Sequence, residues 1–267
     1  MMMNTGDSEI QLISSLQNNF VTSIRNCNES SYTYSAMELL KESSLSHILL
    51  QQASLLGNAA PMVTGTLFAK RYSVFIMGLM ASASIHDTLL STSLNHVRFS
   101  LIQGGAMAYE TVIMEKSLLP AFGTQERDLQ FREYMKSLQS HTDLLFQAIA
   151  SQTGANVKVM WALVSHNVRQ LYSRLVEDQK HWRTKNRLEM IQKDQMLLFE
   201  PGNDNRFAVK LHIFKHPEWH GSHFYLRPYC CLAYQIDSGG GAEDYCTTCP
   251  KLNPEERLQL LNDNKKH

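Results

Sequence analysis

The chain has 267 residues, of which 43% are hydrophobic, so it is long enough for one large domain with a substantial core. Lysine plus arginine and aspartate plus glutamate both total 25, so no overall field would attract nucleic acid or an anionic membrane surface. Because the first ten residues lack the basic and apolar regions of a secretory signal, we expect a cytoplasmic protein with reduced cysteines.

Helical spacing of apolar residues dominates residues 1–92. It predicts one helix from about Ser8 to Arg25 and a second from about 36 to 56. Ser35 and Glu38 have the form of a capping box before the second helix, and Gly57 suits the position after its end.

A third helix is predicted after Pro61, running toward Leu90. Its apolar side chains occupy more than one side, so we expect it to be buried in the core. The longest apolar passage, Val74 to Ile85, lies within it and is shorter than the ~20 residues that cross a membrane. We therefore expect no membrane-spanning segment.

Residues 95–114 change to the alternating pattern of strands, and Gly104-Gly105 suits a tight turn, so we predict a hairpin. Residues 124–194 return to helical spacing, with helices predicted from Gln125 to Ser151 and from Val157 to Gln192. Thr153-Gly154 separates them and Asn156 caps the second, which is long enough to break near Asp178.

Residues 196–252 are predicted to hold strands and a cysteine loop. Extended segments are expected at Met196–Phe199, Phe207–Phe214 and Phe224–Ile236, with a turn at 201–205. Asn253, Pro254 and two acidic residues after them predict a short helix over 253–263. The elements together predict one α+β domain over 1–267, predominantly helical, with antiparallel strands and hairpins and a C-terminal Cys₄ loop.

Four of the five cysteines lie in this loop. Cys230 and Cys231 are adjacent, fourteen residues separate them from Cys246-x-x-Cys249, and Pro250 follows. Four such thiols indicate a metal site, because Cys₄ is the ligand set of structural zinc and of iron–sulfur clusters. Neighbouring side chains of a strand point to opposite faces, so Cys230 and Cys231 can both ligate only if the backbone bends or if they reach different irons. We prefer a binuclear cluster, while zinc, a vicinal disulfide and free thiols stay open.

The pattern C-C, spacer, C-x-x-C-P, with Arg227 upstream, resembles the C-terminal signature of the FhuF-like ferric-siderophore reductases. The apolar segment 159–164 around Trp161 is similar to a helix of that family, whereas the spacer with Gly239-Gly240-Gly241 is longer than the family's. The resemblance implies a [2Fe–2S] cluster, with cofactor- and metal-binding residues Cys230, Cys231, Cys246 and Cys249, and an oxidoreductase that reduces iron(III)-siderophores. No nucleotide, flavin or hydrolase motif is present, so we expect an external electron donor, a ferredoxin or reductase.

Other polar residues give weaker signals. Arg227 could donate to a cluster sulfur and raise its potential, or face solvent as an ordinary strand residue. Four histidines upstream of the cysteines fit a second metal site, a solvated edge, or, with Lys210, Lys215 and Trp219, the rim of a docking surface for an iron complex; they are His212, His216, His220 and His223. We expect ordinary polar positions for His86-Asp87, His96, Arg98, His166 and Arg169, and no role for Cys27.

Two other functions remain open. The first is a structural Cys₄ zinc-binding module without redox activity. The second is a binding protein related to siderophore synthetases, whose C-terminal part resembles the same family. The chain is short for a ligase that also binds nucleotide, and it has no phosphate-gripping loop.

Overall fold

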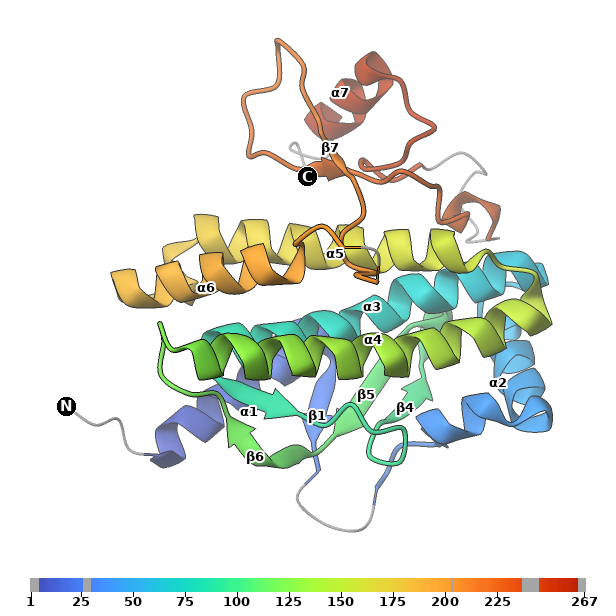
Figure 1. The fold of residues 1–267 in the computed structure, drawn as a ribbon. Coiled ribbons are helices and arrows are strands. Elements are labelled where there is room, and N and C mark those ends of the chain that lie inside the picture. The colour runs from blue at the N-terminus through green and yellow to red at the C-terminus, as the bar shows by residue number, and fades with distance from the viewer. Residues whose placement is uncertain (1–4, 26–29, 203, 237–244, 264–267) are drawn as a thin grey trace.

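A computed structural model describes residues 5–25, 30–202, 204–236 and 245–263. Within them, four long helices form two layers, α3 and α4 beneath α5 and α6, with small sheets and two further helices, α1 and α2, on the other side (Figure 1). The C-terminal segment, with α7, lies above α5 (Figure 1). This confirms the predominantly helical α+β class. In the described part of the chain, no helix is both long and apolar enough to cross a membrane.

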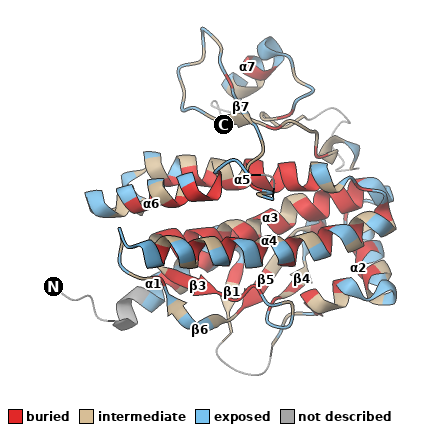
Figure 2. Ribbon diagram, in the orientation of Figure 1, coloured by how far each residue is buried: buried red, intermediate tan, exposed pale blue. Residues whose placement is uncertain are grey.

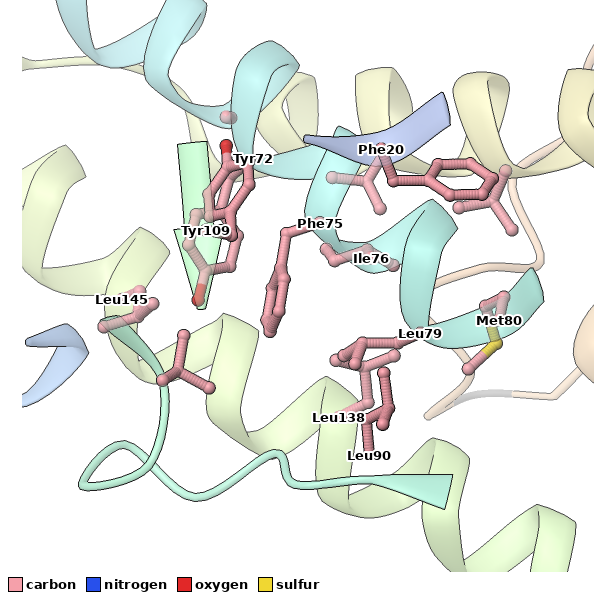
Figure 3. Packing of buried hydrophobic residues seen from close by; sticks show 14 of the residues in the cluster. Phe20, Tyr72, Phe75, Ile76, Leu79, Met80, Leu90, Tyr109, Leu138 and Leu145 are labelled. Carbon is pink, nitrogen blue, oxygen red and sulfur yellow. The ribbon is translucent and has the colours of Figure 1, made fainter. Parts of the chain in front are cut away.

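The core helix is α3 (Pro61–His86), as the sequence predicts. Buried residues run along nearly its whole length (Figure 2), and its aromatic and aliphatic side chains interdigitate with those of its neighbours, among them Phe20, Leu90, Tyr109, Leu138 and Leu145 (Figure 3). It ends at His86 because Asp87 adopts a left-handed conformation, with φ of 52°. The prediction that it continues toward Leu90 is wrong, since Thr88–Leu90 form strand β3.

The predicted breaks between the later helices are confirmed. α4 (Gln125–Thr153) ends at Gly154, and α5 (Val157–Glu177) begins where the Asn156 side chain accepts backbone N–H groups. α5 stops before Asp178, and α6 (Lys185–Leu198) follows. The strand predicted at Met196–Phe199 is wrong, because the chain is helical to Leu198, and Leu197, Leu198 and Phe199 pack into the helical core.

The predicted hairpin is present as β4 (Arg98–Leu101) and β5 (Met107–Thr111). Gly104 and Gly105 have φ of 66° and 64°, which a β-carbon disfavours. β1 (Thr22–Ile24) pairs parallel with β5, and β2 (Tyr34–Ser35) pairs antiparallel with β4. β3 pairs separately with β6 (Ile113–Leu118).

Two predicted N-terminal helices are corrected. α1 (Thr5–Phe20) stops before Val21, whose φ is 48° and whose carbonyl accepts the Tyr109 N–H at 2.8 Å, so the residues that follow join the sheet. The helix predicted over 36–56 is a 3₁₀ turn, Ala36–Leu40, and then α2 (Glu42–Leu55), because Lys41 is extended. Glu38 accepts the Ser35 N–H at 2.7 Å, as a capping box requires.

The C-terminal segment contains less strand than predicted. Only β7 (His212–Ile213) and β8 (Tyr225–Leu226) pair within the ranges predicted as extended. The turn near 201–205 is present, where the Asn205 N–H donates to the Gly202 carbonyl at 3.3 Å. α7 (Pro254–Asp263) has the predicted cap, because Asn253 Oδ1 accepts the Glu256 N–H at 2.8 Å.

A buried ion pair ties the helical layers together. Arg127 of α4 donates to both carboxylate oxygens of Asp194 on α6, at 2.5 and 2.9 Å, and both side chains are at most 1% exposed. Ser84 of α3 donates to Asp194 at 2.9 Å and lies 2.7 Å from the Tyr172 hydroxyl of α5. Four helices therefore meet at one hydrogen-bonded network, and no sequence motif predicts it.

We expect Asp194→Ala to lower the free energy of unfolding by about 3–5 kcal/mol, because it leaves Arg127 buried without its main counter-charge. Lys193→Ala is the control, since it removes the neighbouring surface pair with Asp128 (3.3 Å) and should cost less than about 1 kcal/mol. Urea unfolding followed by circular dichroism measures both. Equal losses in the two variants would contradict the role of the buried pair.

Candidate functional site

Two segments bring the four cysteines together. After β8 the chain runs beside the second cysteine pair, and the Arg227 N–H donates to the Thr248 carbonyl at 3.1 Å. A tight turn then sets the second pair, because the Cys249 N–H donates to the Cys246 carbonyl at 2.7 Å. Both segments lie against α3 and α5 through the apolar contacts described below.

The chain reverses directly after the first cysteine pair. Leu232 adopts φ of 62° and its N–H lies 3.4 Å from Cys230 Sγ, after which a 3₁₀ turn, Ala233–Gln235, begins. A leucine in this left-handed region is sterically strained, so the surrounding contacts must hold it there. This is the backbone bend that the adjacent cysteines require.

The sulfurs form two pairs. Cys230 Sγ lies 3.7 Å from Cys249 Sγ, and the Cys231 and Cys246 thiols are hydrogen-bonded to each other. The neighbours Cys230 and Cys231 therefore face different partners. In the described part of the chain, no three His, Cys, Asp or Glu side chains are arranged to hold one metal ion. The arrangement is thus one of two cysteine pairs.

An apolar wall closes one side of the site. Cys231 is 1% exposed and packs with residues of α3, α5 and the end of α2, namely Leu56, Val63, Leu67 and Leu163. Cys249 is also buried, whereas Cys230 and Cys246 are partly exposed. Water and solutes therefore reach the site from the side of Cys230 and Cys246.

Arg227 is buried among these thiols. Its Nε donates to Thr248 Oγ1 at 3.0 Å, one Nη donates to Cys246 Sγ, and the other Nη has no partner among the residues that the structure describes. Burial alone would lower the pKa of Arg227, but the negative charges of Cys231, Cys246 and Cys249 raise it overall. Its side-chain partners at the site are therefore a hydroxyl and a cysteine sulfur.

The pKa values of Cys231 and Cys246 shift in opposite directions. The hydrogen bond from Cys246 lowers the pKa of Cys231, with help from the positive charges of Lys70 on α3 and Arg227, and it raises the pKa of Cys246. A thiolate is thus favoured at Cys231 although this residue is buried. Thiolates are the form of cysteine that binds metals.

A second buried arginine fixes the C-x-x-C turn. Arg257 of α7 is 3% exposed and donates to the carbonyls of Thr247, Cys249 and Leu252, at 2.9, 2.6 and 3.1 Å. Its guanidinium also lies over the Phe214 ring, 5.3 Å from the ring centroid. α7 therefore holds the cysteine turn in place while adding positive charge near it.

α5 holds the other segment through His166 and Arg169, which the sequence analysis treated as ordinary polar positions, and through Gln170. His166 Nε2 donates to the Tyr225 carbonyl at 2.8 Å, and Gln170 also donates to it, at 3.4 Å. The Arg169 guanidinium lies between the rings of Phe199 and Tyr225, 3.9 and 5.5 Å from their centroids. Their spacing along one helix face is the only sequence signal that could have identified them.

The histidines upstream do not form a metal site among the described residues. His212, His220 and His223 are exposed, and His216 stacks on Phe214 with ring centroids 6.3 Å apart. Phe214 also contacts the rings of Trp219 and Phe224, so this segment has a small aromatic core. Cys27 and the three spacer glycines 239–241 lie outside the described residues.

The remaining polar positions lie in the body of the fold. Asp87 pairs with Arg187 at 2.6 Å, His96 lies 2.9 Å from Ser91, and Arg98 donates to the Tyr32 carbonyl at 3.0 Å. Each has a partner within the fold, as expected of satisfied polar positions.

The chain was compared with protein-family models and with curated proteins. No family model matches the chain, and no match among curated proteins was found. The case for a function therefore depends on the cysteine site and its surroundings.

We expect Arg257→Ala to loosen the C-x-x-C turn, because three carbonyls lose charged donors worth about 1.5–3 kcal/mol each in stability. Hydrogen exchange at Cys249 and Leu252, whose N–H groups close turns in this segment, should quicken by about tenfold or more. Gln259→Ala, at an exposed position of the same helix, should leave these rates unchanged. Unchanged exchange in Arg257→Ala, with α4 amides equally protected, would show that the arginine does not hold the turn.

Proposed function

We propose that this protein is a [2Fe–2S] ferric-siderophore reductase that transfers one electron to iron(III) in a siderophore and so releases iron(II) in the cytoplasm. The observation that carries the proposal is a buried arginine that donates a hydrogen bond to Cys246 Sγ, beside four cysteines arranged as two pairs. The resemblance of the cysteine pattern to the FhuF-like reductases supplies the reaction class.

The sulfur arrangement fits two metal ions. Tetrahedral iron or zinc with bonds of about 2.3 Å places its sulfur ligands about 3.8 Å apart. Cys230 and Cys249, at 3.7 Å, match this separation and would hold one iron. Cys231 and Cys246 are in contact and would hold the other.

The local charge also fits. Two iron(III) ions, two sulfides and four thiolates sum to a net negative charge, and reduction adds one more electron. A buried guanidinium is costly without a partner, and one Nη of Arg227 donates to Cys246 Sγ. The other Nη, which has no partner among the described residues, is a donor that a cluster atom would satisfy, and such donors raise a cluster's reduction potential.

The chain supplies the surroundings for electron transfer. The cluster, when bound, would supply one-electron chemistry. The apolar wall of Leu56, Val63 and Leu163 excludes water from Cys231, and Cys230 lies toward the open side. Iron(III) binds hard anionic oxygens much more tightly than iron(II), so a single electron weakens the siderophore's hold. An external donor, a ferredoxin or a reductase, would return the electron.

The alternatives receive less support from the site. A structural zinc ion needs four sulfurs around one point, whereas the described cysteines form two pairs. No observation at the site favours a binding protein related to siderophore synthetases.

We expect anaerobically purified protein to be red-brown and to contain about two irons and two sulfides per chain. Replacing Cys230, Cys231, Cys246 or Cys249 by alanine should bleach or destabilise the chromophore, because each loses a ligand. Cys27→Ala, outside the motif, is the control and should keep its spectrum. Stoichiometric zinc in a colourless protein would overturn the proposal.

We expect chemically reduced protein to lose its reduced-state spectrum when mixed with an iron(III)-siderophore and a ferrous chelator. About one iron(II) should be trapped per electron released, since ~59 mV corresponds to tenfold in a one-electron equilibrium and trapping pulls the transfer forward. Hydroxamate and citrate complexes should react faster than catecholates, which hold iron(III) more tightly. If no complex reacts while an unrelated protein acceptor does, the protein is an electron carrier instead.

A further inference from the structure

The open side of the cysteine site carries two tyrosines and a lysine. Tyr234 follows the first cysteine pair, Tyr245 precedes Cys246, and Lys251 follows Pro250. The tyrosine rings meet at 61° with centroids 5.1 Å apart. Lys251 Nζ donates to the Tyr234 hydroxyl at 2.7 Å and lies 4.2 and 5.6 Å from the centroids of the Tyr234 and Tyr245 rings. We call these three residues the tyrosine–lysine corner.

This corner adjoins the more exposed part of the site. Lys251 lies two residues after Cys249, whose Sγ is 3.7 Å from that of the partly exposed Cys230, whereas Cys231 is buried against α3 and α5. A reaction partner that approaches Cys230 therefore meets the corner. The ammonium uses one of its three donors on Tyr234, so donors remain for an anionic ligand.

Among the described residues, four positively charged side chains act on the cysteines: Lys70, Arg227, Arg257 and Lys251. Of these four, Lys251 is the exposed one. Arg227 and Arg257 donate to a cysteine sulfur and to backbone carbonyls, whereas among the described residues the contacts of Lys251 are the neutral Tyr234 hydroxyl and the faces of the two tyrosine rings. Its charge is therefore available to attract an anion from solution.

We propose that the tyrosine–lysine corner is the contact site for negatively charged oxygen-donor complexes of iron(III), which it brings to Cys230. The inference rests on the proposed function and specifies where the substrate binds and which charge it carries. The tyrosine rings provide flat faces for the organic part of the complex, and Lys251 meets its carboxylate or other anionic oxygens. Electron balance is that of the parent reaction: one electron leaves the reduced protein and converts iron(III) to iron(II).

Charge reversal at Lys251 tests the inference. Reduced wild-type protein, Lys251→Glu and Lys251→Gln are mixed at low ionic strength with ferric citrate, which is anionic, or with ferrioxamine B, which carries a net positive charge. We expect Lys251→Glu to slow reoxidation by ferric citrate by about tenfold and Lys251→Gln by less. Ferrioxamine B should react as fast as with wild type, or faster, and added salt should shrink the differences.

Three comparisons keep the result interpretable. Lys136→Glu, at an exposed position on α4, makes the same charge change elsewhere and should match wild type. Iron content and the visible spectrum of every variant are measured first, so that only proteins with equal chromophore are compared. Quenching of tyrosine and tryptophan fluorescence by ferric citrate reports binding without electron transfer, and it should weaken in Lys251→Glu.

The outcomes separate the two proposals. If wild type reacts with the iron complexes and Lys251→Glu reacts with each complex as fast as wild type does, the corner is not the contact site and the reductase function stands. If Lys251→Glu slows only reoxidation by an acidic protein acceptor, the corner binds a protein partner and the inference is overturned. If wild type reacts with neither iron complex, the proposed function fails first.

Discussion

A buried positive charge must have an anion near it, and this constraint shapes the cysteine site. Arg227 is almost completely buried, and the negative charges that act on it belong to cysteines. Arg127 is a second buried arginine in this fold, and its partner is the carboxylate of Asp194. Arg127 and its carboxylate form a structural pair, whereas Arg227 donates to a cysteine sulfur, a group that can also bind metal.

Two faces of α5 support this arrangement. One face of the helix packs on α3, while His166, Gln170 and Arg169 hold β8 by its backbone carbonyl and by the Tyr225 ring. Two residues beyond Tyr225 the chain reaches Arg227, so the position of the guanidinium is set by a helix rather than by a loop. α7 likewise fixes the turn that carries Cys246 and Cys249, because Arg257 donates to the Cys249 carbonyl.

Much of the fold follows from local sequence signals. The predictions that are wrong concern segments whose conformation is set by contacts with residues far along the chain. α3, the Gly104-Gly105 hairpin and the cap of α7 are predictable because spacing, turn glycines and capping residues act within a few positions. β1 is not, because Val21 leaves the helix to accept a hydrogen bond from Tyr109, far along the chain. β8 is short for a similar reason, since His166 and Gln170 bond its first carbonyl instead of another strand.

The same distinction holds for the site. Clustering of four cysteines and the need for a bend at Cys230-Cys231 are visible in the sequence, but the pairing of Cys230 with Cys249 depends on the left-handed turn at Leu232, which leucine does not favour. The burial of Arg227 and the role of Arg257 are set by tertiary packing. No local pattern distinguishes them from surface arginines.

The site is asymmetric, and this has a consequence for any electron transfer through it. Cys231 and Cys249 are each 1% exposed, the former against the apolar wall, whereas Cys230 and Cys246 lie toward solvent. Under the proposed function, donor and iron complex would both have to approach the same open side. They could not occupy it together if both need close contact with Cys230. The two half-reactions would then alternate, with the protein storing one electron between them, and an excess of either partner would slow the other by competing for the tyrosine–lysine corner.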